Sequence, residues 1–253
     1  MTAPLLEIKK LHKAFGKVVT ANGIDLILEK GVLTSIIGPN GAGKSTLINM
    51  LSGSLPVDSG EILFEGKDIT QLPIHKRVRM GLCRSFQVVN VFPDLSVFDN
   101  IQIPVLAVQK RGTRLFRPVS GERMVHEEVH QVLERVGLEN RAHTLANALS
   151  HGDQRLLEVG IALAVRPRLL FLDEPTAGMN PVERVKVLDN IKRLSAEGKT
   201  TFVIVEHDMD IVFSLSDRVI VLHHGDIIAD GTTDEIQDSK RVREVYLGEE
   251  VME

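Results

Sequence analysis

Short apolar runs occur along the whole length of this chain. Longer segments, in which apolar and polar residues mix, separate them. The runs predict strands at residues 5–9, 24–28, 32–38, 81–86, 169–173, 201–205 and 218–231, and a short strand and turn at residues 60–69. Helical spacing predicts helices at residues 44–53, 181–196 and 208–216, while residues 97–135 are rich in helix formers but interrupted by Pro104, Gly112 and Pro118. Thr232 and Glu235 have the spacing of a capping box, which predicts a last helix. Strands that alternate with helices indicate an α/β fold with a mainly parallel sheet.

Composition narrows the class of protein. A chain of 253 residues with 43% hydrophobic residues suggests one large domain, or one domain with an inserted subdomain. The net charge of −4 gives no support for general nucleic-acid binding, and the single Cys83 cannot form an internal disulfide. The apolar runs are strand-sized and fall short of the ~20 residues of a membrane helix. We therefore expect a protein that is soluble by itself and that another chain would hold at a membrane.

The segment GPNGAGKST begins at Gly38 and matches the phosphate-loop pattern G-x-x-x-x-G-K-[ST]. It follows a predicted strand and opens a predicted helix, as this motif requires. Lys44 is expected to reach the β- and γ-phosphates of a nucleotide, and the Ser45 hydroxyl to bind Mg²⁺. The predicted nucleotide-binding residues of this segment are Asn40, Gly41, Gly43, Lys44, Ser45 and Thr46.

An acidic pair ends the apolar run RLLFLDEP. Asp173 is expected to hold Mg²⁺, and Glu174 to face the γ-phosphate and polarise a water molecule. The alternative is that both residues only cap a helix. Two further polar residues end predicted strands: Gln87 is placed to touch Mg²⁺ and the attacking water, and His207 to contact the γ-phosphate.

A second polar segment, LSHGDQRLLE at residues 149–158, has one glycine and leads directly into an amphipathic helix. That layout is typical of an anion site at a helix N-terminus.

Taken together, GPNGAGKST, Gln87, LSHGDQR, LLFLDEP and His207 resemble the ATP-binding subunit of an ABC transporter, in this order and over nearly the whole chain. The resemblance implies a single ABC ATPase domain, residues 1–253, with an N-terminal antiparallel β subdomain and a helical subdomain at about residues 88–165. It also implies a head-to-tail dimer, with an identical or paralogous subunit, in which Ser150, Gly152 and Asp153 contact the ATP of the partner. Phe15 corresponds to an aromatic that stacks on adenine; the alternative is a core phenylalanine.

Departures from the general pattern point to a subset of this family. His151 and Asp153 replace a glycine and a glutamine of the usual signature, and Asn180 stands where an aspartate is usual. With IVEHDM at 204–209, VYLGE at 245–249 and the extended segment 104–125, these residues resemble the ATP-binding subunits of branched-chain amino-acid importers.

The expected function is therefore an ATPase motor for amino-acid import, with ATP and Mg²⁺ as cofactors. The resemblance implies permease subunits that dock near residues 90–101 and, indirectly, a solute-binding protein as partners, but no nucleic acid. It also implies a cytoplasmic location, on the inner face of the cell membrane. The alternatives are a urea or lipopolysaccharide transporter subunit, or a ribosome- or nucleic-acid-acting ATPase. The basic run Lys110–Arg117 is either a solvated loop or a contact to lipid headgroups or a membrane partner.

Overall fold

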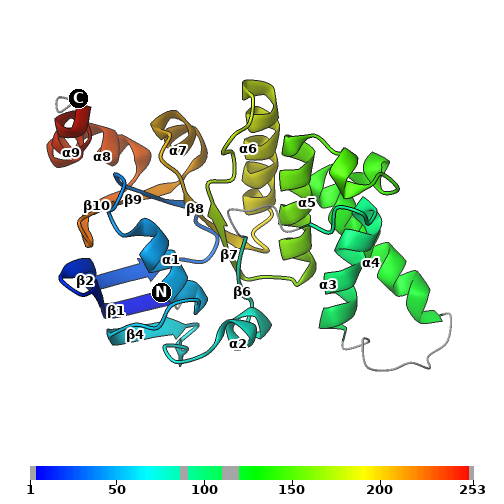
Figure 1. Ribbon diagram of the computed structural model, residues 1–253, viewed down its shortest axis with the longest axis horizontal. Coiled ribbons are helices and arrows are strands. Elements are labelled where there is room, and N and C mark those ends of the chain that lie inside the picture. The colour runs from blue at the N-terminus through cyan, green and yellow to red at the C-terminus, as the bar shows by residue number, and fades with distance from the viewer. Residues whose placement is uncertain (1–3, 86–90, 110–119, 251–253) are drawn as a thin grey trace.

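The computed structural model describes residues 4–85, 91–109 and 120–250. These residues form two β-sheets, with helices packed around them (Figure 1). One apolar cluster lies around α1 and the first sheet, a second lies among the helices on the other side, and a third lies under the last helices. The predicted α/β fold, a mainly parallel sheet with an antiparallel β unit and inserted helices, is confirmed.

The first sheet is antiparallel, with the strand order β2-β1-β4-β5. Its strands are β1 (Leu6–Phe15), β2 (Val18–Leu28), β4 (Ser59–Phe64) and β5 (Lys67–Asp68). Both β1 and β2 run well beyond the predicted residues 5–9 and 24–28. A register shift between Ile8 and Leu11 breaks the alternation of buried and exposed side chains. The alternating sequence pattern therefore ends before the strand β1 ends.

The second sheet has the order β10-β9-β3-β8-β7-β6. Its strands are β3 (Thr34–Ile37), β6 (Leu82–Arg84), β7 (Leu169–Asp173), β8 (Thr201–Val205), β9 (Arg218–His223) and β10 (Asp226–Gly231). All neighbours are parallel except β9 and β10, and every residue of β3, β7 and β8 is buried, as continuous apolar runs predict. The predicted strand region 218–231 is a hairpin, with its tight turn at His224 and Gly225.

Three helices between β6 and β7 pack together beside the β6 edge of this sheet (green in Figure 1). They are α3 (Val97–Val108), α4 (Ser120–Val136) and α5 (His151–Ala164), with short 3₁₀ turns at Glu139–Arg141 and Ala146–Ala148. The expected interruption at Pro104 is wrong, because α3 runs through it. Ser96 caps this helix, and its face of Val97, Ile101 and Val105 is completely buried, which offsets the lost hydrogen bond. Gly112 and Pro118 lie outside the described residues.

The remaining helices are α1 (Lys44–Ser52), α2 (Ile74–Arg79), α6 (Pro181–Ala196), α7 (Met209–Leu215), α8 (Thr233–Asp238) and α9 (Lys240–Glu250). The bounds predicted for α6 and the capping box of Thr232 and Glu235 are confirmed. Within the described part of the chain, no helix combines the length and apolar character needed to cross a membrane.

Candidate active site

The phosphate loop, residues 38–43, joins the end of β3 to the start of α1. Two neighbouring backbone segments lie so close to its glycines that a side chain would not fit there. A Cβ at Gly38 would lie 2.1 Å from the Leu222 carbonyl oxygen, and one at Gly43 would lie 2.3 Å from the Thr20 carbonyl oxygen. Both glycines also have positive φ angles, 153° and 103°. The loop is therefore fixed between β2 and the end of β9, and only glycine fits at these two positions.

The loop has the properties of an anion site. No side chain caps the N-terminus of α1, so its first amides and the positive end of its dipole face the loop. Lys44 folds back over the loop, and its Nζ donates to the carbonyl oxygens of Gly38 at 2.5 Å and Pro39 at 3.0 Å. Asn40, Gly41 and Ser45 are exposed and Thr46 is half-buried, so a ligand can reach them.

The acidic pair lies at the same edge of the sheet as the phosphate loop. Asp173 ends β7, which pairs in parallel with β8, and β8 pairs in parallel with β3. The carboxyl ends of parallel strands meet at one edge, so Asp173 and Glu174 lie beside the start of α1. Neither residue caps a helix, because α6 begins at Pro181 with Asn180 as its N-cap. The helix-cap alternative is therefore wrong.

Glu174 and His207 are brought together across neighbouring strands. Glu174 follows β7, His207 follows β8, and Glu174 Oε1 lies 3.7 Å from His207 Nδ1. Glu174 has a φ of 44°, a region that residues with side chains rarely adopt, and its N–H donates to the Val205 carbonyl oxygen at 2.9 Å. Backbone strain of this kind is found preferentially at functional sites.

Buried Asp173 has a cationic partner that the sequence did not reveal. Arg84 of β6 donates from Nη2 to Asp173 Oδ2 at 2.8 Å and also contacts Asn49 of α1. Only 11% of the Arg84 side chain and 2% of the Asp173 side chain are exposed. The one sequence signal for Arg84 was a cation at the end of a short apolar strand.

Oxygen donors near the loop fit a magnesium ion held together with a nucleotide. Mg²⁺ takes oxygen ligands, usually one or two from the protein, and keeps several waters. The Asp173 carboxylate at the end of β7 and the Ser45 hydroxyl in the first turn of α1 supply that chemistry. No group of three or more histidine, cysteine or acidic side chains that could hold a metal by themselves occurs among the described residues. Gln87, the third expected ligand, lies outside those residues, as does the basic run Lys110–Arg117.

In the polar segment at residues 149–158, helix α5 already begins at His151, so most of the segment is helical. Ser150 is the N-cap, and its Oγ accepts from the Asp153 N–H at 3.2 Å. The buried Gly152 N–H donates to Glu183 Oε1 at 3.4 Å. The negative charge of Asp153 is balanced by Lys186, whose Nζ lies 2.6 Å from Asp153 Oδ1.

Ser150, Gly152 and Asp153 are not gathered with the phosphate loop. Figure 1 shows that β7, β8 and α6 lie between α5, which these residues begin, and α1. The N-termini of α1 and α5 are therefore two separate places in the fold, and only that of α5 is capped by a side chain.

Phe15 lies at the end of β1 and is 51% exposed. The Lys13 Nζ lies 5.4 Å from the centre of its ring. The alternative of a core phenylalanine is therefore wrong, and the ring is open to a stacking partner.

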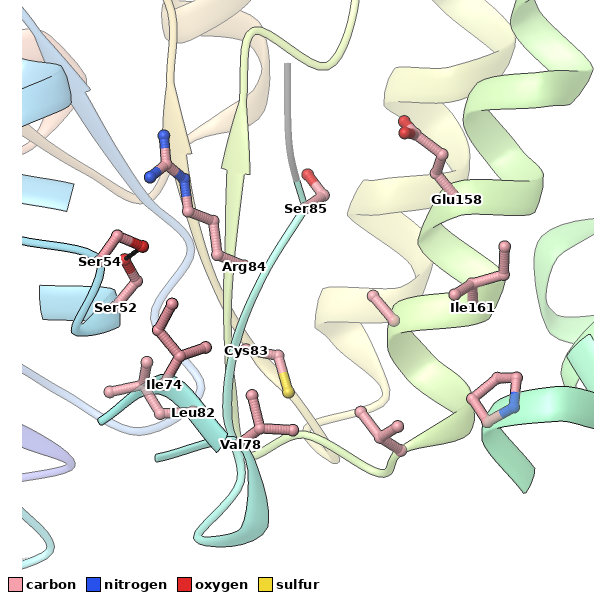
Figure 2. Close-up of a pocket in the computed structure, with 13 residues that line it drawn as sticks. Ser52, Ser54, Ile74, Val78, Leu82, Cys83, Arg84, Ser85, Glu158 and Ile161 are labelled. Carbon is pink, nitrogen blue, oxygen red and sulfur yellow. Dashed lines mark hydrogen bonds between the residues drawn. The ribbon is translucent and has the colours of Figure 1, made fainter. Parts of the chain in front are cut away.

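A pocket of about 260 Å³ lies between β6 and α5 (Figure 2). Its walls are mostly apolar, with contributions from Ile74, Val78, Leu82 and Ile161. Arg84 and Ser85 line it on the strand side, and Glu158 projects into it from α5.

Comparison with known proteins agrees with this geometry. A family model described as ABC transporter matches residues 21–177, and one described as branched-chain amino acid ATP-binding cassette transporter matches residues 227–251. The high-affinity branched-chain amino acid transport ATP-binding protein BraF of Pseudomonas aeruginosa is 38% identical, over 98% of this chain and 100% of its own. A probable branched-chain amino acid transport ATP-binding protein, LivG of Archaeoglobus fulgidus, is also 38% identical, over 96% and 95% of the two chains.

A solved structure of similar fold is the ADP conformation of an ATP-binding cassette of an ABC transporter. It is 32% identical with a TM-score of 0.84, and covers 98% of this chain and 100% of its own. The predicted resemblance to branched-chain amino-acid transport subunits is thus confirmed, and the chain belongs to the ABC transporter family, as one of its ATP-binding subunits.

Proposed function

We propose that this chain is the ATP-hydrolysing motor subunit of an importer for branched-chain amino acids. The observation that carries the proposal is the edge where β3, β7 and β8 end. It brings a phosphate loop, a buried carboxylate and the pair Glu174 and His207 together. The names of the relatives support the amino-acid class, since several are transport ATP-binding proteins for branched-chain amino acids.

Each residue at this edge has a role in the proposed reaction. Residues 38–46 hold the phosphates, with Lys44 over the β- and γ-phosphates, and Phe15 stacks on the adenine ring. Ser45 and Asp173, with Gln87, would hold Mg²⁺, which neutralises phosphate charge when bound. Glu174 accepts a proton from the attacking water, and His207 contacts the γ-phosphate.

The complete site needs a second subunit in this proposal. Ser150, Gly152 and Asp153 begin α5, which lies across β7, β8 and α6 from α1 (Figure 1), and this separation supports a role at the site of another copy. Two subunits, identical or paralogous, would pair head-to-tail and close each α5 N-terminus over the ATP of the partner. In this arrangement residues 1–253 are a single ABC ATPase domain, and a helical subdomain at about residues 88–165 carries the trans contacts.

Membrane partners complete the proposed complex. The pocket between β6 and α5, which Pro104 of α3 also lines, would accept an apolar side chain of a permease subunit that docks near residues 90–101. The chain would then lie on the cytoplasmic face of the cell membrane, and a solute-binding protein would deliver the amino acid from the other side. No nucleic-acid partner is proposed, because the charge of the chain is slightly negative.

Lys44→Ala tests the proposal, with exposed Lys30→Ala as the matched control. We expect Lys44→Ala to lower ATP hydrolysis by about 10²–10³-fold, because the phosphates lose their cation. In cells that lack the chromosomal gene, the wild-type and Lys30→Ala chains should restore uptake of radiolabelled leucine, and Lys44→Ala should not. Normal hydrolysis by Lys44→Ala would reject the site. Normal leucine uptake without any copy of the chain would reject the amino-acid class.

A further inference from the structure

Glu174 requires support from its surroundings. Its φ of 44° places a residue with a side chain in the left-handed region, and such a conformation persists only where neighbouring groups hold it. The Glu174 N–H donates to the Val205 carbonyl oxygen at 2.9 Å. The Glu174 carbonyl oxygen, with those of its two neighbours, accepts hydrogen bonds from a residue of another element.

That residue is Arg155, in the second turn of α5. Its Nη2 donates to the carbonyl oxygens of Asp173 at 2.6 Å and Glu174 at 3.0 Å. Its Nε donates to the carbonyl oxygen of Pro175 at 3.2 Å. One guanidinium therefore binds three consecutive carbonyls, with the strained residue in the middle.

The environment suits arginine specifically. Arg155 and Glu158 are each only 5% exposed, and Arg155 Nη1 donates to Glu158 Oε2 in an ion pair within α5. A guanidinium presents five N–H groups in a rigid plane, so it can serve a carboxylate and several carbonyls at once. The single nitrogen of a lysine cannot reach three carbonyls spread along a backbone segment.

We propose that Arg155 is a positioning residue of the ATPase: through the carbonyls of residues 173–175 it holds Glu174 in the backbone conformation that directs its carboxylate toward the attacking water. This role rests on the proposed function of Glu174 as the general base. Arg155 is buried and acts by fixing Glu174, the residue proposed to contact the water.

The position of Arg155 on α5 gives this role a wider consequence. The same helix begins with Ser150, which is placed to contact the nucleotide of a partner, and Glu158 lines the pocket proposed for a permease side chain (Figure 2). A displacement of α5 by a partner at Ser150 or by a side chain in the pocket would therefore move the guanidinium that holds Glu174. The geometry of the general base then depends on what contacts α5.

Arg155→Lys tests the role in the full chain, with Arg166→Lys as the matched control. Arg166 follows the C-terminal end of α5, is exposed, and pairs with Glu128 far from the site. We expect Arg155→Lys to lower kcat for ATP hydrolysis by about 10–100-fold, since a displacement of about 1 Å at a reacting group has that effect. The KM for ATP should stay within about twofold, because the phosphate loop is untouched. Arg166→Lys should leave both values unchanged.

A second pair of measurements separates positioning from loss of structure. On the Glu174→Gln background, adding Arg155→Lys should lower the residual rate no further, because the group that it positions is already gone. An equal further loss, or a raised KM with normal kcat, would overturn the role. If Arg155→Lys does not fold, Arg155→Gln is measured instead. Failure of both to fold would also overturn it, because Arg155 would then be needed for the fold itself.

The outcomes also distinguish this role from the proposed function. A wild-type chain without ATP hydrolysis would reject the proposed function and the role of Arg155 with it. An inactive Glu174→Gln beside a fully active Arg155→Lys would reject the role of Arg155 alone.

Discussion

Replacing Arg84 by methionine should destabilise the nucleotide-free protein far more than the loss of an ordinary surface ion pair. Methionine keeps an unbranched apolar stem but carries no charge, so the substitution leaves the Asp173 carboxylate buried without its cation. Both partners are shielded from water, with 11% of the Arg84 side chain and 2% of the Asp173 side chain exposed. The contact from Arg84 to Asn49 of α1 is lost as well.

The burial of this pair sets the expected magnitude. Breaking a buried ion pair by removing one partner costs about 3–5 kcal/mol, because a buried charge is left uncompensated. We expect about 3 kcal/mol for Arg84→Met, since part of the guanidinium still reaches solvent. The matched control is Arg123→Met on α4, which removes an exposed pair with Glu127 whose members are 86% and 59% exposed. That loss should be about 0.3–0.5 kcal/mol.

Urea denaturation without nucleotide or Mg²⁺ measures the free energy of unfolding of each variant. The double variant Arg84→Met with Asp173→Asn adds a sharper test. It removes both charges, so it should be more stable than Arg84→Met alone. Equal losses for Arg84→Met and Arg123→Met would refute the reasoning, as would a double variant less stable than Arg84→Met.

Three further predictions concern separate parts of the molecule. Phe15→Ala should weaken ATP binding by about 1–3 kcal/mol, measured by titration calorimetry, and leave the melting temperature unchanged because the ring is exposed; unchanged affinity would remove Phe15 from the site. Burial raises the pKa of the Glu206 carboxyl above its ordinary value of 4.5, so the folded state loses stability as pH rises from about 4.5 through that raised pKa. Glu206→Gln should therefore gain stability relative to wild type between pH 4 and pH 8 in thermal melts, and a difference independent of pH would contradict this. Ser150→Arg should leave nucleotide affinity of the monomer unchanged while ATPase activity of the assembled transporter falls; a large loss of affinity in the monomer would place Ser150 in its own chain's site.

The sequence predicted best those parts of the fold that local pattern determines. The buried strands β7 and β8 have the predicted bounds because fully buried parallel strands are continuous apolar runs. Helix α2 was not predicted, since it is short and its central Arg77 looks like a surface residue. In the structure Arg77 is 2% exposed and donates to the carbonyl oxygens of Met50 and Leu51, at the end of α1. Such capping by a residue distant in sequence leaves no periodic signal.

In the candidate site, too, residues in local motifs were predicted and contacts between distant elements were not. The phosphate loop, Asp173, Glu174 and His207 follow from motifs at strand ends, whose meeting is required by a parallel sheet. The ion pair from Arg84 to Asp173 spans 89 positions, and only the order of the strands brings its members together. Arg155 gave a weaker local signal, as the one cation next to Leu156 and Leu157 on an apolar helix face, with Glu158 three residues further on. That spacing indicates an ion pair, but the carbonyls that Arg155 holds come from another element.

The most direct test of the account is the association state of Glu174→Gln with nucleotide. The glutamine keeps the shape of the side chain but cannot accept a proton, which should lower hydrolysis by about 10²–10⁴-fold and leave ATP bound. With ATP held, the α5 N-terminus of each subunit should stay closed over the nucleotide of the other. Size-exclusion chromatography, with the paralogous subunit added if the chain has one, should then show a dimer with ATP and monomers with ADP. Lost hydrolysis without any ATP-dependent association would contradict the shared site, and normal hydrolysis would remove Glu174 from the mechanism.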